Sequence, residues 1–362
     1  MHKSAHKDIF NFLQQVIPDA QKGQLCKRVC LMTCLIQACI RNGHCRLESL
    51  SEVSEAYQAC KKSSLLQQTK RWLSNKWMDW TMFYMPFVRH FLQGLAAKGE
   101  LVFVMDGSQT GSANTTLMLS VLCKGFAIPV AWVVKKGEKG HFPAEMHIDL
   151  LKMIAPICPA GCRSVLLGDG EFDGQGLQDW CNENNWLFVV RTSSDRQIDF
   201  DGETARFDSI QTTQSIYFIQ GALPSANAVY WKGKKHLKPL FLLTNMELGY
   251  EACNYYKRRF KIETLFKHLK SAGFYIHKTR LKCPEKLTNL IIIVAFAFVF
   301  TFCMGVFLKE NNSIQSLERI VRKDRLHKIT PIAIAQLAIK HRCESILNFF
   351  SDLSKNFNEV FT

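Results

Sequence analysis

The chain has 362 residues, of which 47% are hydrophobic, and its formal net charge at pH 7 is +15. This length leaves room for two or three domains, and the apolar content excludes a generally disordered protein. A basic excess of this size favours a polyanionic partner, either nucleic acid or an anionic membrane surface.

Cysteine is frequent, with 14 in the chain, but far below the content of disulfide-rich secreted scaffolds. Because the sequence opens on a polar stretch and not on an apolar signal peptide, we expect reduced thiols that act mostly as small buried hydrophobes. Cys26, Cys30 and Cys34 are four residues apart and would share one helix face. No CxxC pair or paired histidine motif follows, so the sequence does not favour a zinc site there.

Residues 1–97 are expected to be helical. An apolar-rich segment at 25–40 ends at Asn42-Gly43, which is typical of a helix stop, and further helical pieces follow at 49–59 and 71–97. With their basic residues these pieces fit a small DNA-binding domain. A packing domain whose aromatic residues are simply core is the alternative.

The pattern changes to strands at about residue 99. Apolar runs at 101–105, 115–122 and 126–134 predict antiparallel strands, the last two joined by a tight turn. The next predicted elements are a helix, a strand, a helix and a strand at 143–154, 164–168, 174–182 and 186–191. This is the order of the ribonuclease-H-like fold, so we expect an α/β core around a mixed sheet.

A long helix without Gly or Pro is predicted over 250–271. The domain organisation that we predict is a helical DNA-binding domain, a first part of the catalytic core, a β-rich insertion, a second part of the core with the long helix, and C-terminal helices, at 1–97, 98–192, 193–245, 246–310 and 311–362.

The segment 290–308 holds 19 residues without a charge, which is long enough to span a membrane. A helix buried on all sides in a large core has the same pattern. We prefer the core helix and expect no membrane, because no second span is evident in the sequence and a basic helix lies just before this segment. A membrane-anchored protein is the alternative.

Two aspartates follow apolar strands. Asp106 comes after LVFVM, and Asp169 comes after SVLLG within GDGEFDG. Carboxylates at the ends of neighbouring strands can share a hard divalent cation, but an Asp before a Gly is also a common turn. Asp173 is the alternative second carboxylate; we favour Asp169 because it lies directly at the strand end. We expect Glu171 at the surface.

The predicted helix over 250–271 carries Tyr256, Arg259, Glu263 and Lys270, at steps of three, four and seven residues. These steps place all four on one helix face. The segment has a single acid among many cations, including Lys257, Arg258, Lys261 and Lys267. A solvated basic surface helix is the alternative, although interleaved apolar residues indicate that the helix also packs.

The spacing Tyr-x2-Arg-x3-Glu-x6-Lys resembles the YREK signature of DDE transposases of insertion-sequence family 4. VFVMDGSQTG and LLGDGEFDG resemble the two aspartate motifs of that family, although Gly170 stands where the family often has Arg. The resemblance covers about 99–310. It implies a ribonuclease-H-like core with a β-rich insertion between the second Asp and the Glu helix, where 193–245 lies.

The resemblance also implies the chemistry. Asp106, Asp169 and Glu263 would be the catalytic metal ligands for two Mg²⁺ ions, with Mn²⁺ as a substitute, and carboxylates suit such hard cations. Water would be the first nucleophile and the freed 3′-hydroxyl the next. Arg259 and Lys270 would contact phosphates beside the cut, and Tyr256 would position a phosphate or pack on the terminal nucleotide.

Further candidates for DNA binding come from outside the signature. Trp231 lies among cations, which suits stacking on an extruded base, although an ordinary strand aromatic is the alternative that we favour. Arg191, at the end of a predicted strand, would either contact DNA or pair with an acid. Lys267 belongs to the basic helix, and the lysine-rich segment 135–140 is either a phosphate-contacting loop or a solvated turn.

The sequence therefore predicts a metal-dependent DNA transposase that binds the terminal inverted repeats of its element, cleaves the DNA and joins the 3′ ends to target DNA. We expect a homodimer on DNA, and no nucleotide cofactor because GxxxxGK[ST] is absent. The resemblance implies a cytoplasmic, nucleoid-associated bacterial protein. The alternatives are a catalytically inactive transposase-derived DNA-binding protein and a nuclease of the same fold without a joining step.

Overall fold

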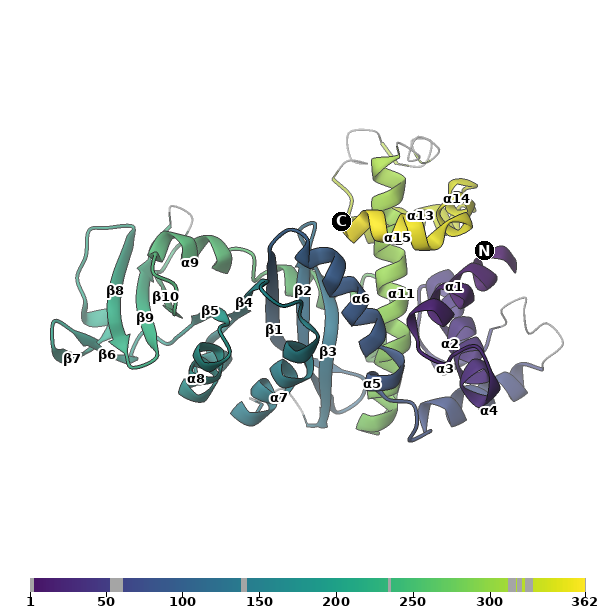
Figure 1. Ribbon diagram of the computed structural model, residues 1–362, viewed down its shortest axis with the longest axis horizontal. Coiled ribbons are helices and arrows are strands. Elements are labelled where there is room, and N and C mark those ends of the chain that lie inside the picture. Colours follow the sequence, from purple (N-terminus) through teal and green to yellow (C-terminus); the bar gives the residue numbers. More distant parts are fainter. Residues whose placement is uncertain are drawn as a thin grey trace.

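The computed structural model describes residues 3–52, 61–137, 142–233, 236–311, 317, 321–322 and 328–361. A sheet crosses the molecule and, within these residues, has eight strands in the order β3-β2-β1-β4-β5-β10-β9-β8. Figure 1 shows the sheet with the N-terminal helices and the C-terminal helices together at one end and the strands β6 to β10 at the other.

The part of the sheet formed by residues 100–191 begins with three antiparallel strands, followed by two strands parallel to the first. These are β1 (Glu100–Thr110), β2 (Asn114–Cys123), β3 (Phe126–Lys136), β4 (Arg163–Gly168) and β5 (Leu187–Arg191). The connecting helices are α7 (Ala144–Ile154) and α8 (Gln175–Glu183). The predicted ribonuclease-H-like α/β core is confirmed, because each apolar run forms the strand expected of it in the expected order.

The predicted insertion is β-rich and continues the same sheet. Its strands are β6 (Gln197–Phe200), β7 (Glu203–Arg206), β8 (Ile216–Leu223), β9 (Ala226–Trp231) and β10 (Leu240–Thr244). β10 pairs antiparallel with β5, and β9 and β8 follow outward, whereas β6 and β7 pair only with each other among the described strands. The insertion therefore extends the catalytic sheet at the edge beyond β5.

The N-terminal region is helical, and its first two helices pack against each other as a hairpin. The helices of this region are α1 (Lys3–Val16), α2 (Gly23–Asn42), α3 (Leu47–Leu50), α4 (Lys62–Leu73), α5 (Trp80–Phe83) and α6 (Met85–Ala96). α2 ends where predicted, since Gly43 takes the left-handed conformation with φ of 58° and its N–H caps Cys39. Most of the helix predicted at 49–59 lies outside the described residues.

The apolar helix α11 (Pro284–Glu310) passes between the sheet and the terminal helices, as Figure 1 shows. It contacts β3, α2 and the C-terminal helices α13 (Pro331–Lys340), α14 (Ser345–Ser351) and α15 (Leu353–Phe361). By length and composition both α11 and α2 could cross a membrane, so the sequence-based statement that no second span exists is wrong. In α11, however, 94% of the apolar window is buried against protein, against 56% in α2. Packing accounts for the apolar surface of α11 without a bilayer.

Candidate active site

Asp106 lies within β1 and not at its end, which corrects the prediction. β1 pairs with β2 as far as Thr110, so the strand outlasts its apolar run. On its other edge the parallel pairing with β4 stops at the pair Val104 and Leu167. The chain of β1 beyond this pair therefore has a free edge, and Asp106 stands at the step where the shorter strand β4 ends.

Asp169 lies directly after β4, as predicted, and its carboxylate caps the following 3₁₀ turn Gly170–Phe172 by accepting from the Glu171 N–H at 3.0 Å. The turn is tight: a Cβ atom at Gly168 would lie 2.7 Å from the Cβ atom of Phe172. Only glycine fits this position, so Gly168 is explained by the close return of Phe172 over the strand end.

The predicted long helix is in fact two helices, α9 (Gly249–Tyr256) and α10 (Lys261–Lys270). The residues between them form turns whose hydrogen bonds span three residues, such as Arg259 N–H to the Tyr256 carbonyl at 3.0 Å. The sequence holds no Gly or Pro here, so the break has a tertiary cause. Arg259 is drawn inward, with 7% of the residue exposed, while Phe260 is turned outward with 51% exposed.

The break lets Arg259 bridge two of the predicted carboxylates. Its Nη2 atom lies 3.0 Å from Glu263 Oε1, and its Nη1 atom lies 3.7 Å from Asp106 Oδ2. Glu263, in the first turn of α10, keeps 55% of its side chain exposed. The signature residues thus meet at the sheet through an ion-pair bridge, although they do not lie on one continuous helix.

The electrostatics of Asp106 indicate that the three carboxylates share one site. Burial raises the pKa of Asp106 to about 6, and the negative charges of Asp169 and, more weakly, Glu263 add to this increase. The Arg259 guanidinium and the Gly107 N–H, which donates to Asp106 Oδ1 at 2.7 Å, act in the opposite direction. The structure therefore places Asp169 and Glu263 near enough to Asp106 for their negative charges to raise its pKa.

The end of α10 also reaches β1. Lys270 Nζ donates to Ser108 Oγ at 2.7 Å, two residues beyond Asp106 on the strand. Lys267, one turn earlier on the same helix, is exposed. Lys270 is thus placed beside the carboxylates, whereas Lys267 lies on the outer surface of α10.

Tyr256 is buried, with 2% exposed, and burial raises its pKa, while the positive charges of Arg259 and Arg191 lower it. Arg191, the last residue of β5, is exposed. The Arg259 guanidinium lies 5.8 Å from the centroid of the Tyr256 ring, so the buried tyrosine adjoins the residue that bridges the carboxylates.

The two neighbouring acids differ from each other. Asp173 Oδ2 accepts from Thr192 Oγ1 at 2.6 Å and lies 3.9 Å from Arg196, so its contacts tie it to the chain after β5. The prediction that Glu171 lies at the surface is wrong. Its side chain is only 17% exposed, because Oε1 accepts from the Phe142 N–H at 2.6 Å and lies near His147.

Trp231 is the last residue of β9 and has 7% exposed. Its ring packs edge-on against His236, with ring centroids 4.4 Å apart, and Lys257 Nζ lies 5.4 Å from the ring centroid. In this structure Trp231 has the packing of an ordinary strand aromatic. In the lysine-rich segment 135–140, β3 ends at Lys136 and residues 138–140 lie outside the described part.

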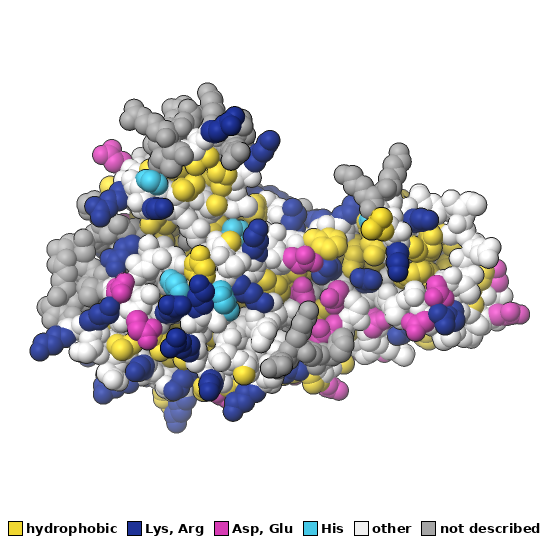
Figure 2. Space-filling view, turned by 180° about the vertical axis from the view of Figure 1, so that it is seen from behind, with side chains coloured by type: hydrophobic (Ala, Val, Ile, Leu, Met, Phe, Trp, Pro, Cys, Tyr) yellow, Lys and Arg dark blue, Asp and Glu magenta, His cyan; other side chains and the backbone are white. Residues whose placement is uncertain are grey.

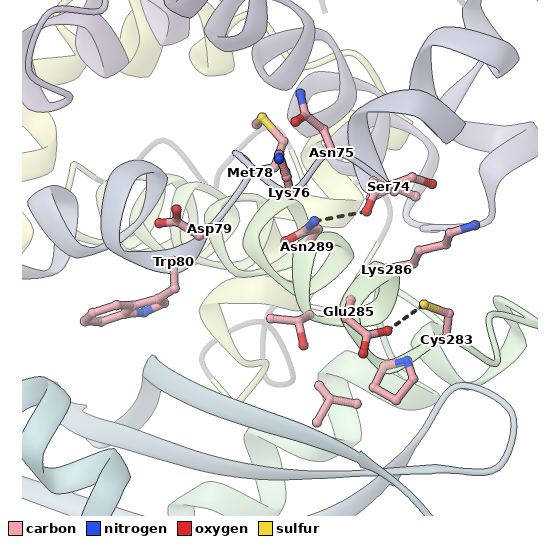
Figure 3. Close-up of a pocket in the computed structure, with 14 residues that line it drawn as sticks. Ser74, Asn75, Lys76, Met78, Asp79, Trp80, Cys283, Glu285, Lys286 and Asn289 are labelled. Atoms are coloured by element: carbon pink, nitrogen blue, oxygen red, sulfur yellow. Dashed lines mark hydrogen bonds between the residues drawn. The ribbon is translucent and has the colours of Figure 1, made fainter.

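A cavity of about 530 Å³ lies elsewhere, between the chain after α4 and the start of α11. Figure 3 shows Lys76, Asp79, Glu285 and Asn289 around it. None of the predicted site residues lines this cavity. At the carboxylate site, Glu263 has 55% of its side chain exposed and Asp106 has 18%.

The raised pKa of Asp106 predicts a pH-dependent penalty on folding. A carboxyl with a folded pKa of about 6 and an ordinary value of 3.8 binds its proton more tightly in the folded state, so stability falls as pH rises through this window. We expect Asp106→Asn to be about 1–3 kcal/mol more stable than the parent at pH 8 in EDTA, with the difference vanishing below about pH 4. Urea denaturation across this pH range measures it. Asp149→Asn, an exposed change on α7, is the control, and a constant difference at every pH would contradict the prediction.

The chain matches the model of the transposase DDE domain over residues 77–300. No curated protein sequence matches it. Among solved structures, the piggyBac transposase synaptic complex with hairpin DNA is 11% identical with a TM-score of 0.47, covering 98% of this chain and 83% of that one. Endonuclease V of Ciona intestinalis, in complex with DNA, is 15% identical with a TM-score of 0.30, covering 62% of this chain and 97% of that one.

The family match takes in more than half of the chain. It includes β1, β4 and α10, the elements that carry Asp106, Asp169 and Glu263. The chain therefore belongs to the transposase DDE domain family.

Proposed function

We propose that this chain is a DNA transposase of the insertion-sequence family 4 type, which binds the terminal inverted repeats of its element, cleaves them and joins the 3′ ends to target DNA. The observation that carries the proposal is the meeting of Asp106, Asp169 and Glu263 at one step of the sheet, with Arg259 between two of them. The YREK spacing supports the assignment to this family.

The donor set fits a hard divalent cation. Asp106, Asp169 and Glu263 offer only oxygen ligands, which suit Mg²⁺, with Mn²⁺ as a substitute. Burial, followed by the negative charge of Asp169, raises the pKa of Asp106 to about 6, and a bound cation would favour the ionised form of this carboxylate. We propose that these three residues hold two ions, which when bound activate the attacking oxygen and stabilise the leaving oxygen.

The surrounding cations would position DNA. Arg259 is held by two carboxylates through charge–charge contacts, so neutralising these carboxylates would free its guanidinium for a phosphate beside the cut. Lys270 extends to the free edge of β1, where it would hold the neighbouring phosphate. Tyr256 would support Arg259 and Arg191 from beneath. Lys267 and Trp231 would contact DNA further out, Trp231 only after its ring is uncovered.

The distribution of charge supports binding of a long polyanion. Figure 2 shows one face of the molecule. On this face, Lys and Arg side chains are spread widely over the half formed by the terminal helices, and Asp and Glu side chains gather toward the other half. We propose that the N-terminal helices bind the transposon ends. Because both ends must be cut together, a homodimer on DNA in the bacterial cytoplasm, associated with the nucleoid and not with a membrane, is part of the proposal.

Strand joining tests the proposal against a nuclease of the same fold. Precut, labelled end DNA that carries a free 3′-hydroxyl is incubated with supercoiled plasmid, purified protein and Mg²⁺ or Mn²⁺. Transfer of label to the plasmid supports a transposase. Nicked plasmid and shortened ends without transferred label would indicate a nuclease, and salt-sensitive binding without any cut would indicate an inactive DNA-binding relative.

Lys270→Ala is expected to weaken binding to end DNA and to lower the dependence of log affinity on log salt by about one unit, since one phosphate contact is lost. Fluorescence anisotropy at several salt concentrations measures both quantities. Lys152→Ala removes the same charge from an exposed side chain on α7, away from the terminal helices, and serves as the matched control. An equal change of slope in both variants would contradict a specific phosphate contact at Lys270.

A further inference from the structure

The helical hairpin of α1 and α2 brings three possible metal ligands together, away from the carboxylate site. His6 lies on α1, and Cys30 and Cys34 lie one turn apart on α2. Their ligand atoms all lie within 4.8 Å of one another, and His6 Nε2 is 3.1 Å from Cys34 Sγ. The two helices pack antiparallel, which brings His6 to Cys30 and Cys34. The same packing places Gln14, two turns after His6, beside Cys26, two turns before Cys34.

The distances suit a single tetrahedral ion. Zinc bonds of about 2.3 Å to sulfur and about 2.0 Å to nitrogen place such ligands roughly 3.5–3.8 Å apart. His6 Nε2 and Cys34 Sγ, at 3.1 Å, stand slightly closer than this, and the other separations do not exceed 4.8 Å, so rotations of χ angles would bring the three atoms to the required geometry. The ligand types point to the metal as well, since two thiolates and one imidazole select zinc over magnesium or calcium.

The surroundings give access without full exposure. Cys34 is 2% exposed, whereas Cys30 and His6 are half-buried, so an ion could enter from the side of Cys30. Cys26 Sγ is already engaged by Gln14 Nε2 at 3.8 Å. A water molecule would therefore take the fourth position.

Other thiols of the chain show what this cluster has in addition. Cys39 and Cys303 are completely buried and behave as small apolar side chains. Cys158 and Cys162 have the same four-residue spacing as Cys30 and Cys34, but no histidine joins them in a metal-binding group among the described residues. His6, Cys30 and Cys34 combine three features: two thiols one helical turn apart, an imidazole from a second helix, and partial exposure.

We propose that His6, Cys30 and Cys34 form a zinc site that ties α1 to α2 in the N-terminal helical region. The ion would cross-link two helices that are otherwise joined by the loop 17–22 and by apolar packing. This proposal does not depend on the catalytic function, since it concerns a different region and a different class of ligands.

Cobalt substitution of the full-length protein tests the site directly. Protein purified under reducing conditions and stripped of metal is titrated with Co²⁺, and thiolate coordination gives intense absorbance in the near ultraviolet and tetrahedral bands in the visible. Carboxylate sites give neither, so ions bound at Asp106, Asp169 and Glu263 do not interfere. We expect about one equivalent of thiolate-bound Co²⁺, displaced by Zn²⁺. Wild-type protein without these bands would overturn the proposal, whatever its activity.

Variants then locate the ligands. His6→Gln and Cys30→Ser are each expected to weaken Zn²⁺ binding at least about tenfold in competition with a chromogenic chelator. The double variant C158S/C162S removes two thiols at the same spacing and should bind as the wild type does. Zinc should also protect Cys30 and Cys34 from alkylation, which peptide mass spectrometry reads on unmutated protein. Retention of full affinity in Cys30→Ser, or alkylation unaffected by zinc, would refute the assignment.

Discussion

Glu263→Gln is expected to lower metal-dependent cleavage of end DNA by about 10²–10³-fold or more while leaving DNA binding intact. The substitution keeps the shape of the side chain and removes one negative charge. A neutral amide is a poor ligand for a hard divalent cation, so the site would lose one of its three carboxylates. The measurement uses purified protein and labelled DNA carrying the flanks of the gene, resolved on a denaturing gel with Mg²⁺, Mn²⁺ or EDTA.

The contacts of Glu263 explain why DNA binding should be retained in this variant. Glu263 is 55% exposed and accepts from Arg259 at 3.0 Å, a bond that the Gln side-chain oxygen can keep. Arg259 also retains Asp106 as a partner, so the change leaves no buried charge without a counter-ion. Folding and the basic surface should therefore remain, and affinity measured in EDTA should stay within about threefold of the wild type.

The matched control is Glu251→Gln on α9. Glu251 is a partly exposed glutamate whose partner, Arg163, lies at the start of β4. Its loss should leave cleavage unchanged, because surface ion pairs contribute little. Cleavage that persists in Glu263→Gln, or that falls equally in both variants, would contradict the proposed role of Glu263. Loss of binding and cleavage together would indicate a structural role instead.

The α/β core could be predicted from the sequence because its strands are short, mostly apolar runs bounded by turn residues. Their length favours strands over helices, and the order of the runs restricts the topology. Asp106 and Asp169 then fall on neighbouring strands without any knowledge of side-chain packing. The extension of β1 through Thr110 was not visible, because it depends on pairing with β2 and not on apolar residues.

The break between α9 and α10 shows what the sequence could not reveal. Nothing in the residues 257–260 disfavours a helix, and the turn draws Arg259 inward, where it gains a carboxylate partner from β1, Asp106, in addition to Glu263 four residues further along. The spacing predicted that Tyr256, Arg259 and Glu263 lie close together. That prediction assumed one continuous helix, whereas the structure has two. The pairing of His6 with Cys34 has the same character, since it depends on how two helices pack.

The prediction that α11 is a buried core helix, and not a membrane span, can be tested by a mutation within it. Gly305 lies near the C-terminal end of α11, where it meets the start of α13. A Cβ atom at Gly305 would lie 1.9 Å from the Pro331 carbonyl oxygen and 2.3 Å from its carbonyl carbon. These are backbone atoms at the first turn of a helix, so they cannot yield by changing a rotamer.

Gly305→Ala is therefore expected to destabilise the fold by about 3 kcal/mol or more, even though alanine favours a helix by about 1 kcal/mol over glycine. Gly176→Ala on α8 is the control, because its added methyl group would meet only Ile148 Cδ1 at 3.9 Å. The control should be unchanged or up to about 1 kcal/mol more stable, and urea midpoints compare the two. The contrast separates the two interpretations of the apolar segment: a helix surrounded by lipid would accept the methyl group, whereas a helix packed against the backbone of α13 cannot. Equal urea midpoints for the two variants would mean that α13 does not pack against α11. The prediction that residues 290–308 form a core helix would then be contradicted.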